Sequence, residues 1–204
     1  MDHPVFLSKN GKIRAILKEK NFMDSKLLIK DGDKTLVKLY VTKPNDPPFP
    51  NAVYWIDVDG NGLKDFIVLS SHRGTGIGLN FDYVDIYLKK PDRSYQRISF
   101  ETWAVNLKDF VDLNRNGKYE VIITGFDQGQ SHNYYSYNIY AFYKYRLINA
   151  DQKFPGFPKY VRLTKKPNDK DSHQLSKEER LEFALKKERS IFQETYQLPE
   201  KRDL

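Results

Sequence analysis

Two acidic segments that repeat one pattern 55 positions apart constrain this chain more than any other feature of its sequence. The first, IDVDGNGLKDFIVL, begins at Ile56, and the second, VDLNRNGKYEVIITG, begins at Val111. The offset carries the polar residues of the first segment onto those of the second, namely Asp57, Asp59, Asn61 and Asp65 onto Asp112, Asn114, Asn116 and Glu120. The neighbouring apolar residues follow the same offset. Agreement in both the polar and the apolar residues predicts two copies of one structural unit, because similarity at a fixed period marks repeat architectures.

Each unit is expected to consist of antiparallel strands. Runs rich in β-branched and aromatic residues, separated by glycine, proline and asparagine, indicate strands. We expect these strands at 52–56, 65–71, 82–89 and 94–100 in the first unit, and at 104–111, 119–125, 135–148 and 159–163 in the second. Four-stranded antiparallel units of this length are typical of propeller blades. The sequence therefore predicts a mainly β fold, either a partial propeller or a compact β-domain.

The domain organisation follows from these units. The two repeats cover about residues 50–103 and 104–163, and residues 12–49 are interpreted as a degenerate third unit. Within that unit, alternating apolar runs at 25–29 and 35–41 flank the turn-forming sequence KDGDK. The β domain is thus expected to occupy residues 1–163.

The C-terminal part of the chain changes character. Residues 164–204 are expected to form a polar linker followed by one α-helix over 176–197. Ser176 and Glu179 have the spacing of a capping box. An apolar stripe of helical period is formed by Leu181, Leu185, Phe192 and Tyr196.

The acidic loops have the composition of a calcium site. In the pattern D-x-D-x-N-G-x-x-D, the side chains at positions 1, 3, 5 and 9 and one backbone carbonyl converge within a tight loop that glycine permits. Flexible sets of hard oxygen ligands suit Ca²⁺ better than Mg²⁺. Neither loop contains His or Cys, which disfavours zinc and copper. The expected ligands of site one are Asp57, Asp59, Asn61, Asp65 and the Leu63 carbonyl, and those of site two are Asp112, Asn114, Asn116, Glu120 and the Lys118 carbonyl.

The two sites are expected to differ in affinity. Site one offers three carboxylates, whereas site two offers two and carries Arg115 inside the loop. Fewer charged ligands lower calcium affinity, so site two should bind more weakly or stay empty. The alternative is that these loops are turns without metal, since Asp, Asn and Gly favour turns by themselves.

DVDGNGLKD and DLNRNGKYE resemble the calcium loops of FG-GAP/VCBS-type repeats, which occur in integrin α-subunit propellers and in many exported bacterial proteins. The resemblance covers roughly residues 50–150 and is more specific for the first loop. It implies calcium between the first two strands of each unit, and a role in adhesion, ligand binding or scaffolding. Two clear units cannot close a seven-bladed ring, so this chain departs from the family pattern in size.

The composition of the chain limits its possible partners and its cellular location. The net charge is +7, yet the charges of both signs are dispersed, which disfavours a nucleic-acid partner. No stretch is long and apolar enough to cross a membrane, and the absence of Cys excludes disulfides. Weak calcium sites fill outside the cell. We therefore expect a secreted or periplasmic protein, in its mature form without a signal peptide, that binds a protein or glycan partner.

Two further hypotheses concern other polar residues. A hydrolase-like enzyme built on the β scaffold would use His72, Asp82, Asp85 and His132. A binding surface for sugar rings or peptide would combine Arg73 and His132 with Tyr135 and Tyr137. For the tyrosines, the alternative is packing in the core and in a cross-strand aromatic ladder. A non-catalytic binding or scaffolding protein is the preferred interpretation.

Overall fold

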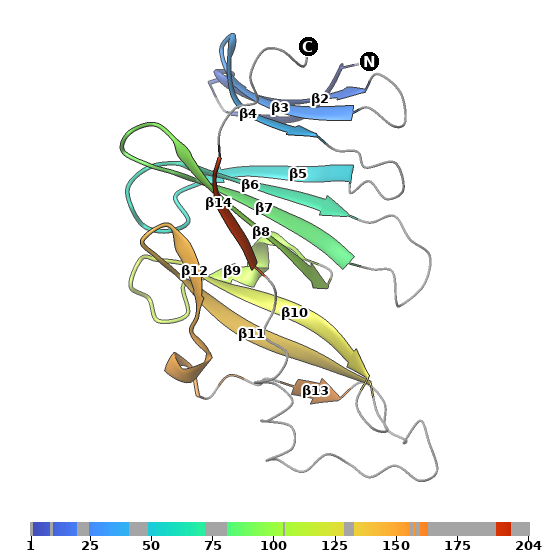
Figure 1. Ribbon diagram of the computed structural model, residues 1–204, viewed down its shortest axis with the longest axis vertical. Coiled ribbons are helices and arrows are strands. Elements are labelled where there is room, and N and C mark those ends of the chain that lie inside the picture. Colours follow the sequence, from blue (N-terminus) through green and yellow to red (C-terminus); the bar gives the residue numbers. More distant parts are fainter. Residues whose placement is uncertain are drawn as a thin grey trace.

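The chain folds into three antiparallel β-sheets stacked on one another (Figure 1). The structure, a computed structural model, describes residues 2–8, 10–19, 25–40, 49–71, 81–103, 105–128, 133–155, 157, 160–162 and 191–196. We call the sheets, from the N-terminus, the first, the middle and the third sheet. The predicted mainly β fold of antiparallel, blade-like units is confirmed.

The first sheet is a four-stranded meander. It contains β1 (Asp2–Leu7), β2 (Ile13–Glu19), β3 (Ser25–Asp31) and β4 (Lys34–Tyr40), in that order. The sequence predicted no strand for β1, which contains Pro4. A proline cannot donate a backbone hydrogen bond and is tolerated at a sheet edge, and β1 is an edge strand whose register shifts between Pro4 and Phe6.

The middle sheet contains the four strands predicted for the first repeat. They are β5 (Phe49–Ile56), β6 (Asp65–Ser71), β7 (Phe81–Lys89) and β8 (Tyr95–Trp103), each paired with its neighbour along the chain. A fifth strand, β14 (Ile191–Tyr196), pairs antiparallel with β8 at the edge.

The strand β14 shows that the predicted helix over 176–197 is wrong at residues 191–196, while the rest of that range lies outside the described residues. Phe192 and Tyr196 fit a helical stripe, but the segment IFQETY is also rich in the β-branched and aromatic residues that strands favour. Pairing with β14 satisfies backbone N–H and C=O groups at the edge of β8 that would otherwise be unpaired. Gln193 then exchanges two hydrogen bonds with the backbone of Leu147 in the third sheet, at 3.1 and 3.2 Å.

The third sheet corresponds to the second repeat, with two local differences. Its elements are the 3₁₀ helix η2 (Leu107–Asp109), β9 (Phe110–Val111), β10 (Glu120–Gln128), β11 (Asn133–Tyr143), β12 (Arg146–Asn149), the 3₁₀ helix η3 (Asp151–Lys153) and β13 (Tyr160–Arg162), which pairs with β11. The predicted strand 104–111 shrinks to β9 because Asn106 caps η2. The predicted strand 135–148 is a hairpin, because Lys144 and Tyr145 adopt left-handed φ angles of 47° and 63°.

Two hydrophobic cores cover the two faces of the middle sheet. Ile67 and Ile86 belong to the core shared with the third sheet, which contributes Val121 and Ile123. The residues that alternate with these along the strand, such as Phe66, belong to the core shared with the first sheet. Successive strand residues point to opposite faces, so a sheet buried on both faces needs the continuous apolar run that β6 carries.

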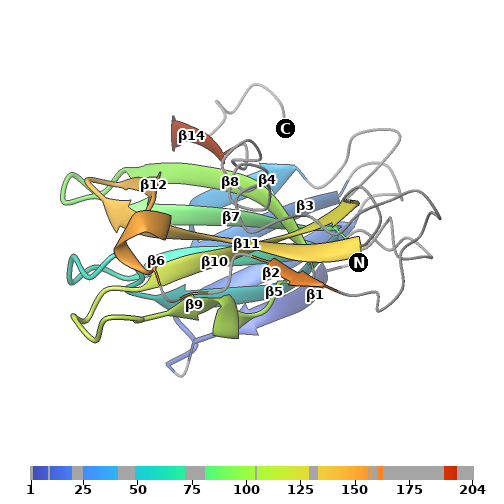
Figure 2. The same ribbon diagram turned by 90° about the horizontal axis from the view of Figure 1, so that it is seen from below.

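The two acidic loops lie at the same end of this stack. The β5–β6 loop and the β9–β10 loop are both at the left in Figure 1 and in Figure 2, the view turned by 90°. Each loop joins the first two strands of its sheet, so the stacking of the sheets brings the two loops together.

Candidate metal centre

Loop one, residues 57–64, is folded by its own polar side chains. The two carboxylate oxygens of Asp57 accept hydrogen bonds from the backbone N–H groups of Asn61 at 3.1 Å and Gly62 at 2.8 Å. Asp59 accepts a second bond from Asn61 N at 3.1 Å, and Asn61 Oδ1 accepts one from Leu63 N at 2.7 Å. In each bond the backbone donor follows the side-chain acceptor by a few residues, so the chain folds back over that side chain. The polar side chains therefore point to the inside of the loop.

Asp65 closes the loop from the first position of β6. Its side chain is fully buried, and its two oxygens accept bonds from Val58 N at 2.9 Å and Lys89 N at 2.8 Å. One carboxylate oxygen each from Asp57, Asp59 and Asp65 lies within 4.8 Å of the other two. The structure therefore brings together the three carboxylates that the sequence assigned to site one.

The electrostatics of loop one are unfavourable to negative charge. Burial raises the pKa of Asp65 to about 7, and the Asp59 and Asp57 carboxylates add to this effect, against the two backbone donors. Burial also raises the pKa of Asp59, assisted by the charge of Asp57. A cation held among these oxygens would offset both effects, so the residues present fit a hard divalent ion.

Loop two, residues 112–119, repeats the hydrogen bonds of loop one at the same offset. Asp112 accepts from Asn116 N at 2.9 Å and Gly117 N at 2.8 Å, and Asn116 Oδ1 accepts from Lys118 N at 2.8 Å. The bond from Leu113 N to Glu120, at 2.9 Å, corresponds to the bond from Val58 N to Asp65. The sequence repeat is therefore a repeat of backbone geometry.

Loop two differs from loop one in its charge. Asn114 stands where loop one has Asp59, and its Nδ2 donates to Glu120 Oε1 at 3.2 Å. Arg115 stands where loop one has Gly60, and both residues have a positive φ, 58° and 70°. The Asn114 amide thus occupies a Glu120 carboxylate oxygen that could otherwise bind an ion. Among the described residues, Asp57, Asp59 and Asp65 form the one cluster of three acidic groups close enough to hold an ion.

The two loops are in direct contact. Tyr119 N donates to Val58 O at 3.3 Å across the interface between the sheets. A Cβ added at Gly60 would lie 2.8 Å from Lys118 Cγ and 3.3 Å from the carbonyl oxygen of Gly117. Glycine at this position therefore permits the close approach of loop two, and it adopts the left-handed backbone at little cost.

The residues proposed for a hydrolase do not form a site in the described part of the chain. Asp82 pairs in register with Thr102, and Asp85 pairs with Ser99, so the two aspartates lie on opposite faces of the middle sheet. Asp82 accepts a bond from Val105 N at 2.8 Å. His72 and His132 lie outside the described residues.

Asp85 has a structural partner that the sequence did not indicate. It forms an ion pair with Arg97 Nε at 2.9 Å and a short hydrogen bond with Ser99, and Arg97 also contacts Glu194 of β14 at 3.1 Å. The pairing of β7 with β8 could have suggested this contact, because it places residues 85, 97 and 99 on one face. The network joins β7, β8 and β14.

The tyrosines proposed for a binding surface take part in aromatic packing. The Tyr135 ring centroid lies 6.1 Å from that of Trp103 and 6.3 Å from that of Phe126. Tyr137 lies 6.3 Å from Phe157, edge to face. The packing alternative therefore accounts for both residues, and Arg73, like His132, lies outside the described residues.

Comparisons with known proteins give no match: no family model, no curated protein and no solved structure matches this chain. Among the described residues, no helix is long and apolar enough to cross a membrane. The geometry of the site itself is therefore the basis for assigning a function.

Proposed function

We propose that this chain is a calcium-binding, non-catalytic scaffold in which an ion in loop one fixes the end of the middle sheet. The observation that carries this proposal is the convergence of Asp57, Asp59 and Asp65, whose carboxylate oxygens lie within 4.8 Å of one another. Like charges this close are mutually destabilising in the absence of a counter-charge. The hydrogen bonds of the surrounding loop explain where these carboxylates lie, but they do not neutralise the negative charge.

Calcium suits this donor set better than other metals do. All the side-chain donors are oxygens, which disfavours zinc and copper. The Asp65 carboxylate also holds Val58 N and Lys89 N, and Asn61 Nδ2 donates to Lys89 O at 3.1 Å. The ligands are thus tied to three strands and cannot easily contract to the small octahedron that Mg²⁺ demands.

The ion would act on the fold rather than on a substrate. It would connect the end of β5, the start of β6 and, through Lys89, the end of β7. Because loop two packs on loop one, it would also stabilise the contact with the third sheet. Three carboxylates give modest affinity, of the kind found in extracellular modules, which supports a secreted or periplasmic location and a role in presenting the sheets to a protein or glycan partner.

Calorimetric titration tests this proposal. We expect calcium to bind once per chain with a dissociation constant on the order of 10⁻⁴ M, and magnesium to bind far more weakly. Asp59→Asn removes one of the three charges while keeping an oxygen, so affinity should fall by about tenfold or more, equivalent to about 1.4 kcal/mol. Asp112→Asn removes one carboxylate from loop two by the same Asp-to-Asn substitution and should leave this binding event unaltered.

Two results would count against the proposal. One is the absence of any calcium-dependent heat from the folded wild-type chain. The other is an equal loss of affinity in the Asp59 and Asp112 variants, since this would mean that a general acidic surface, and not loop one, attracts the ion.

A further inference from the structure

A cavity of about 450 Å³ lies between the first sheet and the middle sheet and is lined by residues of both. We propose that it binds a small organic anion that carries an apolar ring. The volume falls within the range of about 300–1,000 Å³ that is usual for ligand sites. The proposal goes beyond calcium binding and does not depend on it.

The floor of the cavity is apolar and largely aromatic. Phe66 and Tyr95, with ring centroids 5.9 Å apart, are buried in the core shared by the two sheets. Ile13 and Leu36 contribute aliphatic surface from the first sheet, and half-buried Trp55 lies beside Phe66 on β5. Aromatic side chains offer flat faces that pack well against a planar or ring-shaped ligand.

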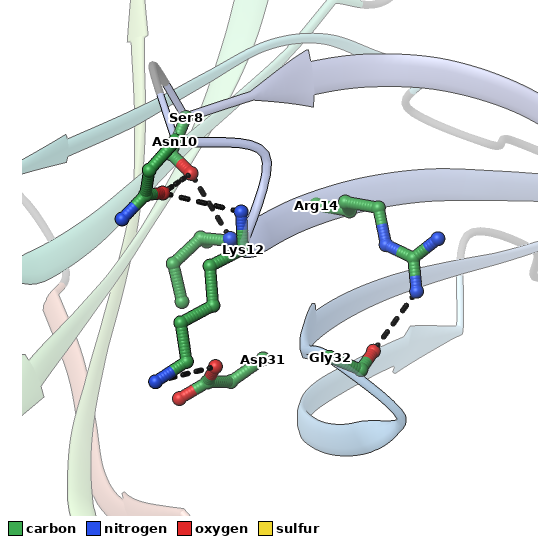
Figure 3. Close-up of polar contacts among 7 residues, drawn as sticks. Ser8, Asn10, Lys12, Arg14, Asp31 and Gly32 are labelled. Carbon is green, nitrogen blue, oxygen red and sulfur yellow. Dashed lines mark hydrogen bonds and ion pairs between the residues drawn. The ribbon is translucent and has the colours of Figure 1, made fainter.

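The rim of the cavity is cationic. Lys12, Lys34, Lys89 and Arg93 line it, together with a single carboxylate, Asp31. Lys12 is engaged with that carboxylate, at 3.6 Å from Lys12 Nζ to Asp31 Oδ1, as Figure 3 shows. Among the described residues, no carboxylate lies within ion-pair distance of the other three cations. The rim therefore keeps a surplus of positive charge.

The wall from the first sheet is held in place by polar contacts. Asn10 Oδ1 accepts hydrogen bonds from Ser8 Oγ at 2.7 Å and Lys12 N at 3.1 Å (Figure 3). Among the described residues, its amide nitrogen has no acceptor. Arg14 donates to Gly32 O at 3.0 Å, across the β2–β3 pairing. The lining residues on this side are thus positioned before a ligand arrives, which lowers the entropic cost of binding.

These two parts define the chemistry of the ligand. An apolar floor below a cationic rim matches a molecule whose ring packs on Trp55 and Phe66 and whose anionic group points outward to Lys34, Lys89 and Arg93. A neutral apolar molecule would leave the rim cations without a partner, and a simple inorganic anion would leave the floor empty. Electrostatic complementarity at the rim also provides specificity.

A matched pair of fluorescent probes tests this proposal on the full chain at constant calcium. Anilinonaphthalene sulfonate has the ring and the anionic group, and phenylnaphthylamine has the same rings without the charge. We expect saturable binding of one sulfonate probe per chain, and at least tenfold weaker binding of the neutral probe. A tenfold difference corresponds to about 1.4 kcal/mol.

Two variants locate the binding site. Lys34→Gln combined with Arg93→Asn removes two rim charges, and asparagine tolerates the φ of 71° at position 93. This variant should bind the sulfonate probe at least tenfold more weakly, with the neutral probe unchanged. Leu36→Trp fills part of the floor and should weaken both probes. Lys108→Gln with Lys153→Gln, which neutralises two exposed lysines near the third sheet, is the matched control and should change neither.

The proposal fails if both probes bind the wild-type chain equally, if binding does not saturate, or if the control weakens the sulfonate probe as much as the rim variant does. Melting temperatures measured for every variant show that the compared chains are folded. Calcium titration of the rim variant separates this proposal from the metal site, because calcium binding should be retained there whichever way the probes behave.

Discussion

In saturating calcium, Asp65→Ala is expected to lower the melting temperature by about 6–12 °C, which corresponds to about 3 kcal/mol for a domain of this size. The substitution leaves the buried N–H group of Val58 and the partly buried N–H group of Lys89 without their acceptor. Each such buried donor costs about 1–3 kcal/mol when it is left unsatisfied. The stabilisation by bound calcium is lost in addition, because ligand binding to the folded state stabilises it by mass action. Thermal melts followed by circular dichroism measure the effect.

Glu120→Ala is the matched control for this prediction. Glu120 is also buried, closes loop two in the same way, and accepts a bond from Leu113 N. Its removal should destabilise the chain through that unsatisfied donor, but the melting temperature should still rise when calcium is added. If the Asp65 variant responded to calcium as strongly as the wild-type chain, Asp65 would not be a ligand.

Without calcium, the chain is expected to lose stability as the pH rises from about 4 to about 7. The pKa of Asp65 in the folded chain, about 7, lies above the value of 3.8 that applies to an unperturbed aspartate. Between these values the folded chain binds more protons than the unfolded chain, so the free energy of unfolding falls with increasing pH. Each pKa unit corresponds to about 1.4 kcal/mol, which limits the contribution of Asp65 to roughly 4 kcal/mol. The raised pKa of Asp59 acts in the same direction.

Melting curves in chelator and in calcium, recorded across this pH range, measure the effect. Calcium should remove this decline towards neutral pH, because the bound ion stabilises the ionised carboxylates. Asp65→Asn carries no titrating group at this position, so its melting temperature in chelator should vary less with pH. A wild-type chain that becomes more stable with increasing pH in chelator would contradict the assigned environment of Asp65.

The sequence predicted the tight turns of the two acidic loops because their geometry is local. Asp57, Asn61 and Gly62 contact one another within a few residues, so the residue types and their spacing already specify the turn. The offset to Asp112, Asn116 and Gly117 then predicted a second copy. The spacing predicted that Asp65 closes the loop from the start of a strand, but not its bond with Lys89, which lies 24 residues further along the chain.

Features that depend on distant partners were predicted less well. Phe192 and Tyr196 were assigned to a helix because a helical period and a strand period fit that segment equally. The open edge of β8 selects the strand, and this edge is set by the fold as a whole. The hairpin at Lys144 and Tyr145 was missed because neither residue is a usual turn former, so no local signal interrupts the aromatic run.

The cavity was not predicted for the same reason. Lys12 and Lys34 come from the first sheet, whereas Lys89 and Arg93 come from one turn of the middle sheet. In the sequence these residues read as dispersed surface charge. Only the stacking of the two sheets gathers them around one opening.

A crystal structure grown in millimolar calcium tests the central claim most directly. We expect one strong peak in loop one, at about 2.3–2.6 Å from oxygens of Asp57, Asp59 and Asp65, with anomalous signal consistent with calcium. A loop that kept the same fold but held water there, with the Asp57 and Asp59 carboxylates turned to solvent, would contradict it.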